Sequence, residues 1–227
     1  MASEHTNSAP PKKNILVIVS HPKDVTLWCG GFMEMHPEHS WFVISLCQAN
    51  GKKKDALHFF KALDHYGARG IISNLNDHKG HQLPFEKIQH RISGLLPNET
   101  FDIVITHHIV EAFNHINNRT ISIAVVRLWA LGVIRSKELW TFAYQSENTI
   151  GLPEPAFGAD ITYDLTFDVW KNKLQMITHL YNYTKHSYEA KSVTCIEAFW
   201  QFKTPKHVIY SLAPKSYLGY YFLDQNM

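Results

Sequence analysis

The feature that most constrains this chain is an apolar strand that runs directly into a polar turn. The segment 15–19 is a continuous run of β-branched and other apolar residues, which is typical of a strand buried on both faces of a parallel sheet. His21 and Asp24 follow immediately. Because open α/β sheets bind ligands outside the carboxyl ends of their strands, we expect both side chains to face a site there. Imidazole and carboxylate together are typical ligands of a zinc ion that keeps an open position.

Strand and helix patterns alternate along the rest of the chain. Strands are expected at 15–19, 41–47, 70–75, 101–106 and 138–143, and helices at 26–36, 55–66, 85–96 and 116–131. This alternation predicts an α/β fold that is Rossmann-like and doubly wound, with a mainly parallel sheet. Further along, we expect a loop near the site at 146–158, a strand at 161–167 and a helix at 170–183, whereas the aromatic-rich segment 192–222 has an ambiguous pattern.

Length and composition fit one domain. The chain has 227 residues, of which 45% are apolar, and this is enough for a sizeable core. We expect residues 1–13 to be a disordered leader, since they lack the apolar core of a signal peptide, and residues 14–227 to form a single domain. The net charge is only +2, whereas proteins that bind nucleic acid are usually strongly basic. We therefore expect no nucleic-acid partner.

Two further observations bear on location. No apolar stretch reaches the roughly 18–20 residues that span a bilayer, so no membrane partner is expected. The cysteines Cys29, Cys47 and Cys195 are odd in number and lie in apolar settings. They are typical of reduced thiols, which predicts a cytoplasmic protein.

A second group of polar side chains follows the fourth expected strand. His107 and His108 come directly after segment 101–106, and His115 and Asn118 lie at the start of the next expected helix. Positions i and i+3 face the same side of a helix. Two groups placed there can therefore enclose one ion together with a His-x-x-Asp turn from a neighbouring strand end.

Together the two segments resemble the motifs of the LmbE-like (PIG-L) family of zinc-dependent N-deacetylases. The first family motif reads roughly Ala-His-Pro-Asp-Asp-Glu before a glycine pair, and here it stands as Ser20-His21-Pro22-Lys23-Asp24-Val25 before Gly30-Gly31. The second motif, Gly-His-x-x-His-Arg, stands as Asn114-His115-Ile116-Asn117-Asn118-Arg119. The resemblance covers residues 14–145, with both motifs in the family's order.

The resemblance implies a hydrolase that removes an acyl group from an amino sugar or a similar amide. It places zinc on His21, Asp24 and the residue at Asn118, with His115 stabilising the tetrahedral intermediate. Lys23 stands where the family has its general base, and Asn118 stands where it has a ligand histidine. An amide oxygen is a poorer zinc ligand than imidazole, and a protonated lysine repels a dication. We therefore expect zinc to be weakly bound or absent.

Several roles remain open at the level of sequence. His21 can be a hydrogen-bonded loop residue, and Asp24 can be a helix N-cap as well as a ligand. Lys23 can pair with Asp24 as an ammonium in place of the metal, or it can act as a base if burial lowers its pKa. Either His107 or His108 can supply a replacement ligand.

Two functions on one fold follow from these observations. The first is a metal-dependent N-deacetylase of weakened or lost activity that takes an amino-sugar-like small molecule. The second is a non-catalytic pseudoenzyme that binds a small molecule or has a structural role. A nucleotide-binding Rossmann protein is excluded, because no Gly-x-Gly-x-x-Gly follows the first expected strand.

Overall fold

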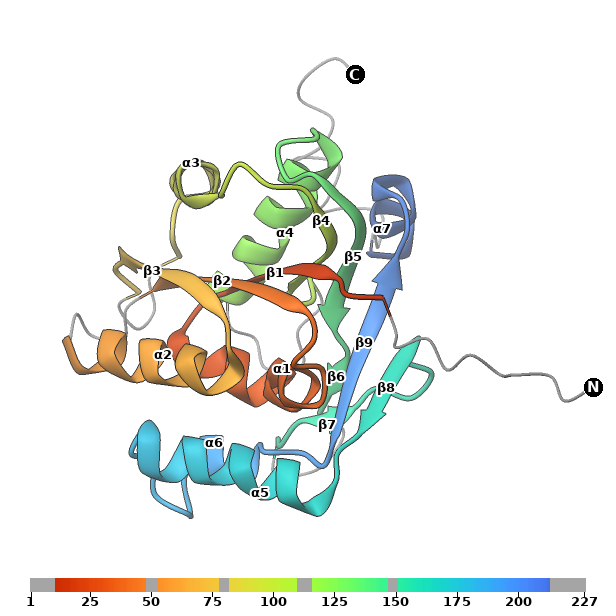
Figure 1. Cartoon of the computed structure of the whole chain (residues 1–227). Coiled ribbons are helices and arrows are strands. Elements are labelled where there is room, and N and C mark those ends of the chain that lie inside the picture. Colours follow the sequence, from red (N-terminus) through yellow and green to blue (C-terminus); the bar gives the residue numbers. More distant parts are fainter. Residues whose placement is uncertain (1–10, 48–52, 78–81, 110–115, 147–150, 213–227) are drawn as a thin grey trace, which may run out of the picture.

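A seven-stranded sheet forms the centre of the protein (Figure 1). The computed structural model describes residues 11–47, 53–77, 82–109, 116–146 and 151–212. The sheet has the order β3-β2-β1-β4-β5-β9-β8. Its strands are β1 (Asn14–Val19), β2 (Ser40–Cys47), β3 (Arg69–Leu75), β4 (Phe101–Thr106), β5 (Ser136–Phe142), β8 (Ile161–Asp164) and β9 (Ile196–Phe202), while β6 (Tyr144–Gln145) and β7 (Glu154–Pro155) pair separately.

The sheet is mainly parallel, as predicted. Strands β3, β2, β1, β4 and β5 run parallel to one another, and only β9 reverses direction against its neighbours β5 and β8. The carboxyl ends of β1, β2, β3 and β4 therefore lie at one edge of the sheet. Residues that follow these strands meet there.

Helices cover both faces of the sheet, which makes the fold doubly wound. They are α1 (Pro22–Met35), α2 (Lys53–Tyr66), α3 (Phe85–Leu95), α4 (Ile116–Ala130), α5 (Phe167–Gln175) with a π-helical turn (Met176–Leu180), α6 (Tyr188–Lys191) and α7 (Pro205–Leu212). Side chains alternate across a strand, so Leu16 and Ile18 of β1 pack with α3 and α4, whereas Ile15 and Val17 pack with α1 and α2. In Figure 1 these two pairs of helices lie on opposite sides of the sheet.

A buried ion pair attaches α1 to β9. The backbone N–H groups of Gly31 and Phe32 donate to the two carboxylate oxygens of Glu197 at 2.8 and 2.7 Å. The ammonium of Lys173 lies 2.6 Å from the same carboxylate, and both charged side chains are fully buried. Gly31 also packs closely against Leu165, since a Cβ at Gly31 would lie 2.5 Å from the end of that side chain, which would have to move.

Several element boundaries differ from the sequence prediction. The strand expected at 161–167 ends at Asp164, since α5 already begins at Phe167. Helix α1 begins at Pro22 and not at 26, since proline is preorganised for the first helical position. The ambiguous segment 192–222 contributes β9 and α7 within the part that the structure describes. The expected helix 170–183 starts earlier, at Phe167, and is α-helical only to Gln175. No helix among the described residues is long and apolar enough to cross a membrane.

Candidate functional site

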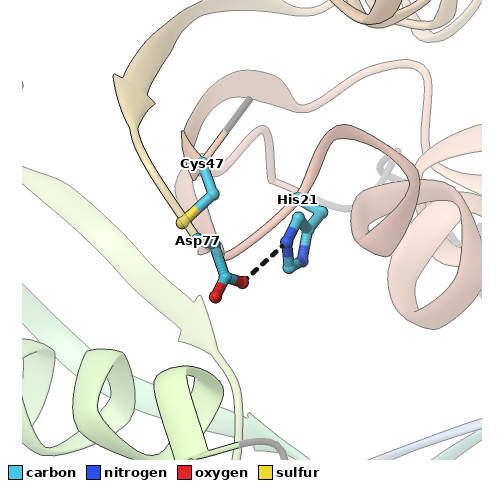
Figure 2. A group of neighbouring side chains, drawn as sticks. All are labelled: His21, Cys47 and Asp77. Atoms are coloured by element: carbon cyan, nitrogen blue, oxygen red, sulfur yellow. Dashed lines mark ion pairs between the residues drawn. The ribbon is translucent and has the colours of Figure 1, made fainter. Parts of the chain in front are cut away.

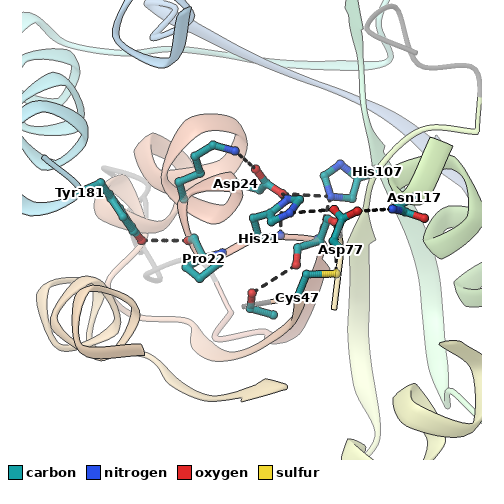
Figure 3. Close-up of polar contacts among 11 residues, drawn as sticks. His21, Pro22, Asp24, Cys47, Asp77, His107, Asn117 and Tyr181 are labelled. Carbon is teal, nitrogen blue, oxygen red and sulfur yellow. Dashed lines mark hydrogen bonds and ion pairs between the residues drawn. The ribbon is translucent and has the colours of Figure 1, made fainter. Parts of the chain in front are cut away.

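His21 and Asp24 lie at the start of α1, where the chain leaves β1. His21 is the N-cap residue of the helix, and its backbone N–H donates to Asp24 Oδ2 at 2.8 Å. The alternative in which Asp24 is itself the N-cap is therefore wrong. Asp24 is at the third helical position and accepts a hydrogen bond from the cap residue, as in a capping box. The hydroxyl of Tyr181 donates to the carbonyl of Pro22 at 2.8 Å and further fixes this turn (Figure 3).

His21 bridges two carboxylates. Its Nε2 lies 3.0 Å from Asp77 Oδ2, and its Nδ1 lies 3.5 Å from Asp24 Oδ2 (Figure 3). Asp77 follows β3, and its other oxygen accepts a hydrogen bond from the amide of Asn117 in the first turn of α4. The amide oxygen of Asn117 in turn accepts the N–H of Leu83 at 2.9 Å. His21 therefore lies in a chain of contacts that joins the ends of β1 and β3 to α4.

Lys23 occupies the other side of Asp24. Its Nζ lies 3.4 Å from Asp24 Oδ1, which is the arrangement that the ammonium alternative predicts. Burial opposes the charged form, but the Asp24 carboxylate outweighs it and raises the pKa of Lys23 to about 12. Lys23 is therefore protonated at neutral pH, and the alternative in which burial lowers its pKa is wrong.

The other titratable groups respond to the same charges. Burial alone would lower the pKa of His21, but hydrogen bonds to Asp24 and Asp77 raise it to about 9. Burial would raise the pKa of Asp24, but Lys23 and His21 hold it well below its ordinary range. Burial, with a further contribution from Asp77, raises the pKa of Cys47 to about 12. At neutral pH the site therefore contains an imidazolium, an ammonium and a neutral thiol.

The two histidines after β4 face different directions. His107 is buried, its Nε2 accepts the N–H of Ser20 at 3.0 Å, and this nitrogen lies 3.6 Å from Asp24 Oδ2. His108 points toward β5, where its Nδ1 lies 2.8 Å from the hydroxyl of Thr141. Of the two candidates for a replacement ligand, His107 is the one beside Asp24, although its Nε2 already accepts a hydrogen bond.

The second motif is only partly visible. Asn118 is buried in the first turn of α4, and its amide oxygen has no hydrogen-bond partner among the described residues. His115 lies outside the described residues. The predicted convergence of His115 and Asn118 on His21 and Asp24 stays a prediction. Asn117 of α4 contacts this network through Asp77, and Ser122 of α4 donates to the carbonyl of His107.

Sequence reasoning missed two potential metal ligands of the site, Cys47 and Asp77. The potential ligand atoms of His21, Cys47 and Asp77 lie within 4.8 Å of one another (Figure 2). Cys47 is the last residue of β2, and Asp77 follows β3 by two residues. The rule that ligands bind at the carboxyl ends of strands, applied to the second and third strands as well as the first and fourth, would have indicated both.

The donor set that the family resemblance implies fits zinc poorly here. Asp24 has one oxygen beside the Lys23 ammonium and the other beside His21 and His107. Two cationic side chains already balance the carboxylates of Asp24 and Asp77. A dication would have to displace Lys23 and a proton from His21 before it could bind to Asp24.

Comparison with known proteins shows the fold. No protein-family model matches the chain, and no curated protein matches its sequence. Among solved structures, the N,N'-diacetylchitobiose deacetylase from Pyrococcus horikoshii is similar with a TM-score of 0.67 and 13% identity, over 90% of this chain and 88% of that one. The A40926 pseudoaglycone deacetylase Dbv21 is similar with a TM-score of 0.57 and 13% identity, over 85% and 98%.

A third similar structure has a different activity. GalB, the 4-carboxy-2-hydroxymuconate hydratase from Pseudomonas putida, has a TM-score of 0.58 and 15% identity, over 83% of this chain and 95% of that one. The fold predicted from the two motifs, that of the LmbE-like deacetylases, is thus confirmed. Because the same fold also carries a hydratase, the reaction must be argued from the side chains of the site.

Proposed function

We propose that this protein is a relative of the LmbE-like deacetylases that binds an amino-sugar-like amide at the carboxyl edge of its sheet and has lost most or all hydrolytic activity. The observation that carries this proposal is the ion pair between Lys23 and Asp24. A base must accept a proton from water, and a lysine whose pKa is raised to about 12 is already protonated. The same ammonium neutralises the carboxylate that the family uses to hold its metal.

The state of His21 supports the proposal independently. A metal-ligating histidine must be neutral, whereas the flanking carboxylates raise the pKa of His21 to about 9. An imidazolium donates hydrogen bonds from both ring nitrogens, and here both face carboxylate oxygens. The network is internally satisfied and serves as a fixed wall of a binding site.

Asn118 supplies the chemistry for ligand binding. A buried amide oxygen without a partner among the described residues is costly, and a ligand N–H or O–H would satisfy it. An N-acetylated amino sugar carries both kinds of donor. We therefore assign Asn118 the role of ligand contact, in place of the metal-ligand role of the family histidine.

The binding test uses N-acetylglucosamine and the full chain, with affinity measured by calorimetry. We expect saturable binding that weakens at least about tenfold in Asn118→Leu, because a buried polar partner is lost. The matched control is Asn98→Leu, since Asn98 is an exposed asparagine bonded to Arg135. Equal binding by both variants, or no binding by the unaltered protein, would count against the proposal.

The activity test uses restoration. The unaltered protein should release no acetate from N-acetylglucosamine above background, with or without added zinc. Asn118→His alone should not restore turnover because the base is still missing, whereas Lys23→Asp combined with Asn118→His should raise zinc retention sharply. Substantial turnover by the unaltered protein, abolished by Asp24→Ala and by Lys23→Ala, would overturn the proposal.

A metal-dependent hydrolase is the second candidate function. The observation in its favour is the grouping of His21, Cys47 and Asp77, whose imidazole, thiolate and carboxylate donors suit zinc. This function predicts that Cys47→Ser lowers both zinc retention and acetate release. The first proposal predicts that Cys47→Ser changes neither.

A further inference from the structure

The turn between α1 and β2 brings three potential metal ligands together at the opposite edge of the sheet. His36, Glu38 and His39 lie within four consecutive positions, and the backbone N–H of His39 donates to the carbonyl of His36 at 3.2 Å. Pro37 occupies the second position of this turn, where its fixed φ favours the turned conformation. The three side chains are therefore positioned by local backbone geometry before any ligand binds.

The distances suit one small cation. Glu38 Oε1 lies 3.0 Å from His36 Nδ1 and 3.5 Å from His39 Nδ1, and one ligand atom from each residue falls within 4.8 Å of the others. Zinc binds nitrogen and oxygen at about 2.0–2.2 Å in tetrahedral geometry, which requires about 3.3–3.5 Å between its ligand atoms. The distance from Glu38 to His39 already has this value, and the distance from Glu38 to His36 is within a few tenths of an ångström of it. The ligand atoms of the two histidines lie within 4.8 Å of each other and would have to move closer on binding.

A second observation points to a ligand at this turn. The His39 side chain is only 5% exposed, and its Nδ1 has no hydrogen-bond partner among the described residues. Its ring packs beside Phe32 and Trp41, with centroids 6.3 and 6.0 Å away. Buried ring nitrogens are normally paired, and this one lies 3.5 Å from Glu38 Oε1 without a hydrogen bond to it. The side chains of Glu38 and His36 are 35% and 28% exposed, which leaves a path from solvent.

We propose that the turn 36–39 binds a divalent transition-metal ion, with zinc as the first choice, through the Nδ1 atoms of His36 and His39 and a carboxylate oxygen of Glu38. Two imidazoles and one carboxylate favour zinc, copper or nickel over magnesium or calcium, which prefer oxygen ligands. Three protein ligands leave a fourth position for water or for an additional donor.

This site is independent of the function proposed for the carboxyl edge. His21 caps the first turn of α1 and His36 caps its last turn. A helix of 14 residues separates them by about 20 Å. A zinc ion at the turn leaves Lys23, Asp24 and His21 untouched, so each proposal can fail without the other.

The test measures zinc binding to the full chain after metal has been removed with a chelator. We expect one zinc per chain, with an affinity at least about tenfold lower in His36→Ala and in Glu38→Gln, because even the loss of a partner outside the ligand shell costs about 10–100-fold. Both changed side chains are partly exposed, so these variants avoid the space that His39→Ala would leave beside Phe32. Far-ultraviolet circular dichroism confirms that each variant is folded.

Two controls separate the outcomes. His65→Ala removes another histidine paired with a carboxylate, since His65 Nε2 lies 3.4 Å from Glu34 Oε2, and it should leave zinc affinity unchanged. His21→Ala should also leave it unchanged. If the unaltered chain binds no zinc, or if His36→Ala and Glu38→Gln bind it as tightly as the unaltered chain, the turn is not a metal site. Zinc that is lost in His21→Ala but kept in His36→Ala overturns this inference and separately contradicts the function proposed for the carboxyl edge.

Discussion

At the residue scale, His21 is the side chain on which the carboxyl-edge network depends. It faces Asp24 and Asp77 with its two ring nitrogens, and its side chain is 17% exposed. The two carboxylates raise its pKa from 6.5 to about 9. The folded protein therefore binds a proton at His21 more tightly than the unfolded chain does, and this difference must appear in the pH dependence of stability.

The direction of that dependence follows from the raised pKa. The contribution of His21 is complete below its unfolded value of 6.5 and is lost as the pH rises through about 9. Between about pH 6 and about pH 10, we expect the unaltered protein to lose on the order of 2–3 kcal/mol of unfolding free energy relative to His21→Gln. Urea unfolding of both proteins at both pH values measures the difference. A difference that does not change with pH would show that His21 is neutral in the folded protein.

Sequence reasoning reached some residues of the site and not others for a physical reason. His21 and Asp24 belong to one turn, so their spacing alone brings them together. Asp77 meets His21 only because β3 ends beside β2, which itself pairs with β1. Asn117 meets Asp77 only because of the rotational position of α4. These contacts depend on the packing of distant elements, which no local pattern records.

At the element scale, the attachment of α1 to β9 depends on one buried carboxylate. Glu197 accepts hydrogen bonds from two backbone N–H groups of α1 and faces the ammonium of Lys173. Replacing one member of a buried ion pair leaves the other charge uncompensated. This typically lowers the free energy of unfolding by about 3–5 kcal/mol. The pair therefore holds in place the helix whose first turn carries His21 and Asp24.

We expect Glu197→Gln to lower the free energy of unfolding by about 3–5 kcal/mol, because it leaves Lys173 charged in an apolar setting. The matched control is Lys137→Met, which removes an ion pair of similar length, 2.7 Å to Asp102, from a lysine side chain that is 75% exposed. Exposed pairs contribute about 0–1 kcal/mol. Urea unfolding compares the two, and equal losses would show that the Glu197 carboxylate is not the attachment point.

Two glycines test how closely the elements pack. A Cβ at Gly70 of β3 would overlap the carbonyl oxygen of Val43 in β2, whereas a Cβ at Gly94 of α3 would meet nothing within 4 Å. Gly70→Ala should therefore destabilise the protein by about 1–3 kcal/mol. Gly94→Ala should stabilise it by up to about 1 kcal/mol, because alanine favours a helix. Thermal unfolding measures the change in stability of each variant relative to the unaltered protein. A Gly70→Ala variant as stable as the unaltered protein would contradict the close approach of β2 and β3.

Element prediction succeeded where one pattern dominated. The strands β1, β2 and β4 consist mostly of apolar and β-branched residues, and their predicted bounds agree with the structure to within one residue. Strand β9 was ambiguous because it mixes buried residues with the charged Glu197, whose partner Lys173 comes from another element. Because the counter-charge of Glu197 comes from a distant element, the local sequence pattern does not identify β9 as a buried strand.

At the scale of the whole molecule, the sheet separates two apolar layers of the core. Its two edges carry two separate groups of polar side chains. One apolar cluster lies under α3 and α4, and the other lies under α1 and α2. His21 and its partners follow the carboxyl ends of the parallel strands, whereas the turn that contains His36 and His39 precedes β2. Helix α1 connects the two regions, so changes in its packing should affect both.

The rates at which the three cysteine thiols are labelled measure how deeply each one is buried in this fold. Cys29 in α1 and Cys47 at the end of β2 are fully buried, and Cys195 is exposed. Burial raises the pKa of Cys29 well above its ordinary value and that of Cys47 to about 12, so neither supplies thiolate to a reagent in the folded protein. We expect one thiol per chain to react rapidly with a disulfide reagent at neutral pH, and this phase should vanish in Cys195→Ser.

The two slow thiols distinguish global from local opening. Cys29 is fully buried in the apolar cluster under α1 and α2. Its labelling should therefore require that cluster to open, and it should speed up in urea as the protein is destabilised. Cys47 lies beside His21 and Asp77, so its labelling measures access to the carboxyl edge. Labelling of both at one rate would show that the carboxyl edge opens only with the rest of the fold. If Cys47 reacts as fast as Cys195, the edge is open in the native state, and the buried ion-pair network proposed there is wrong.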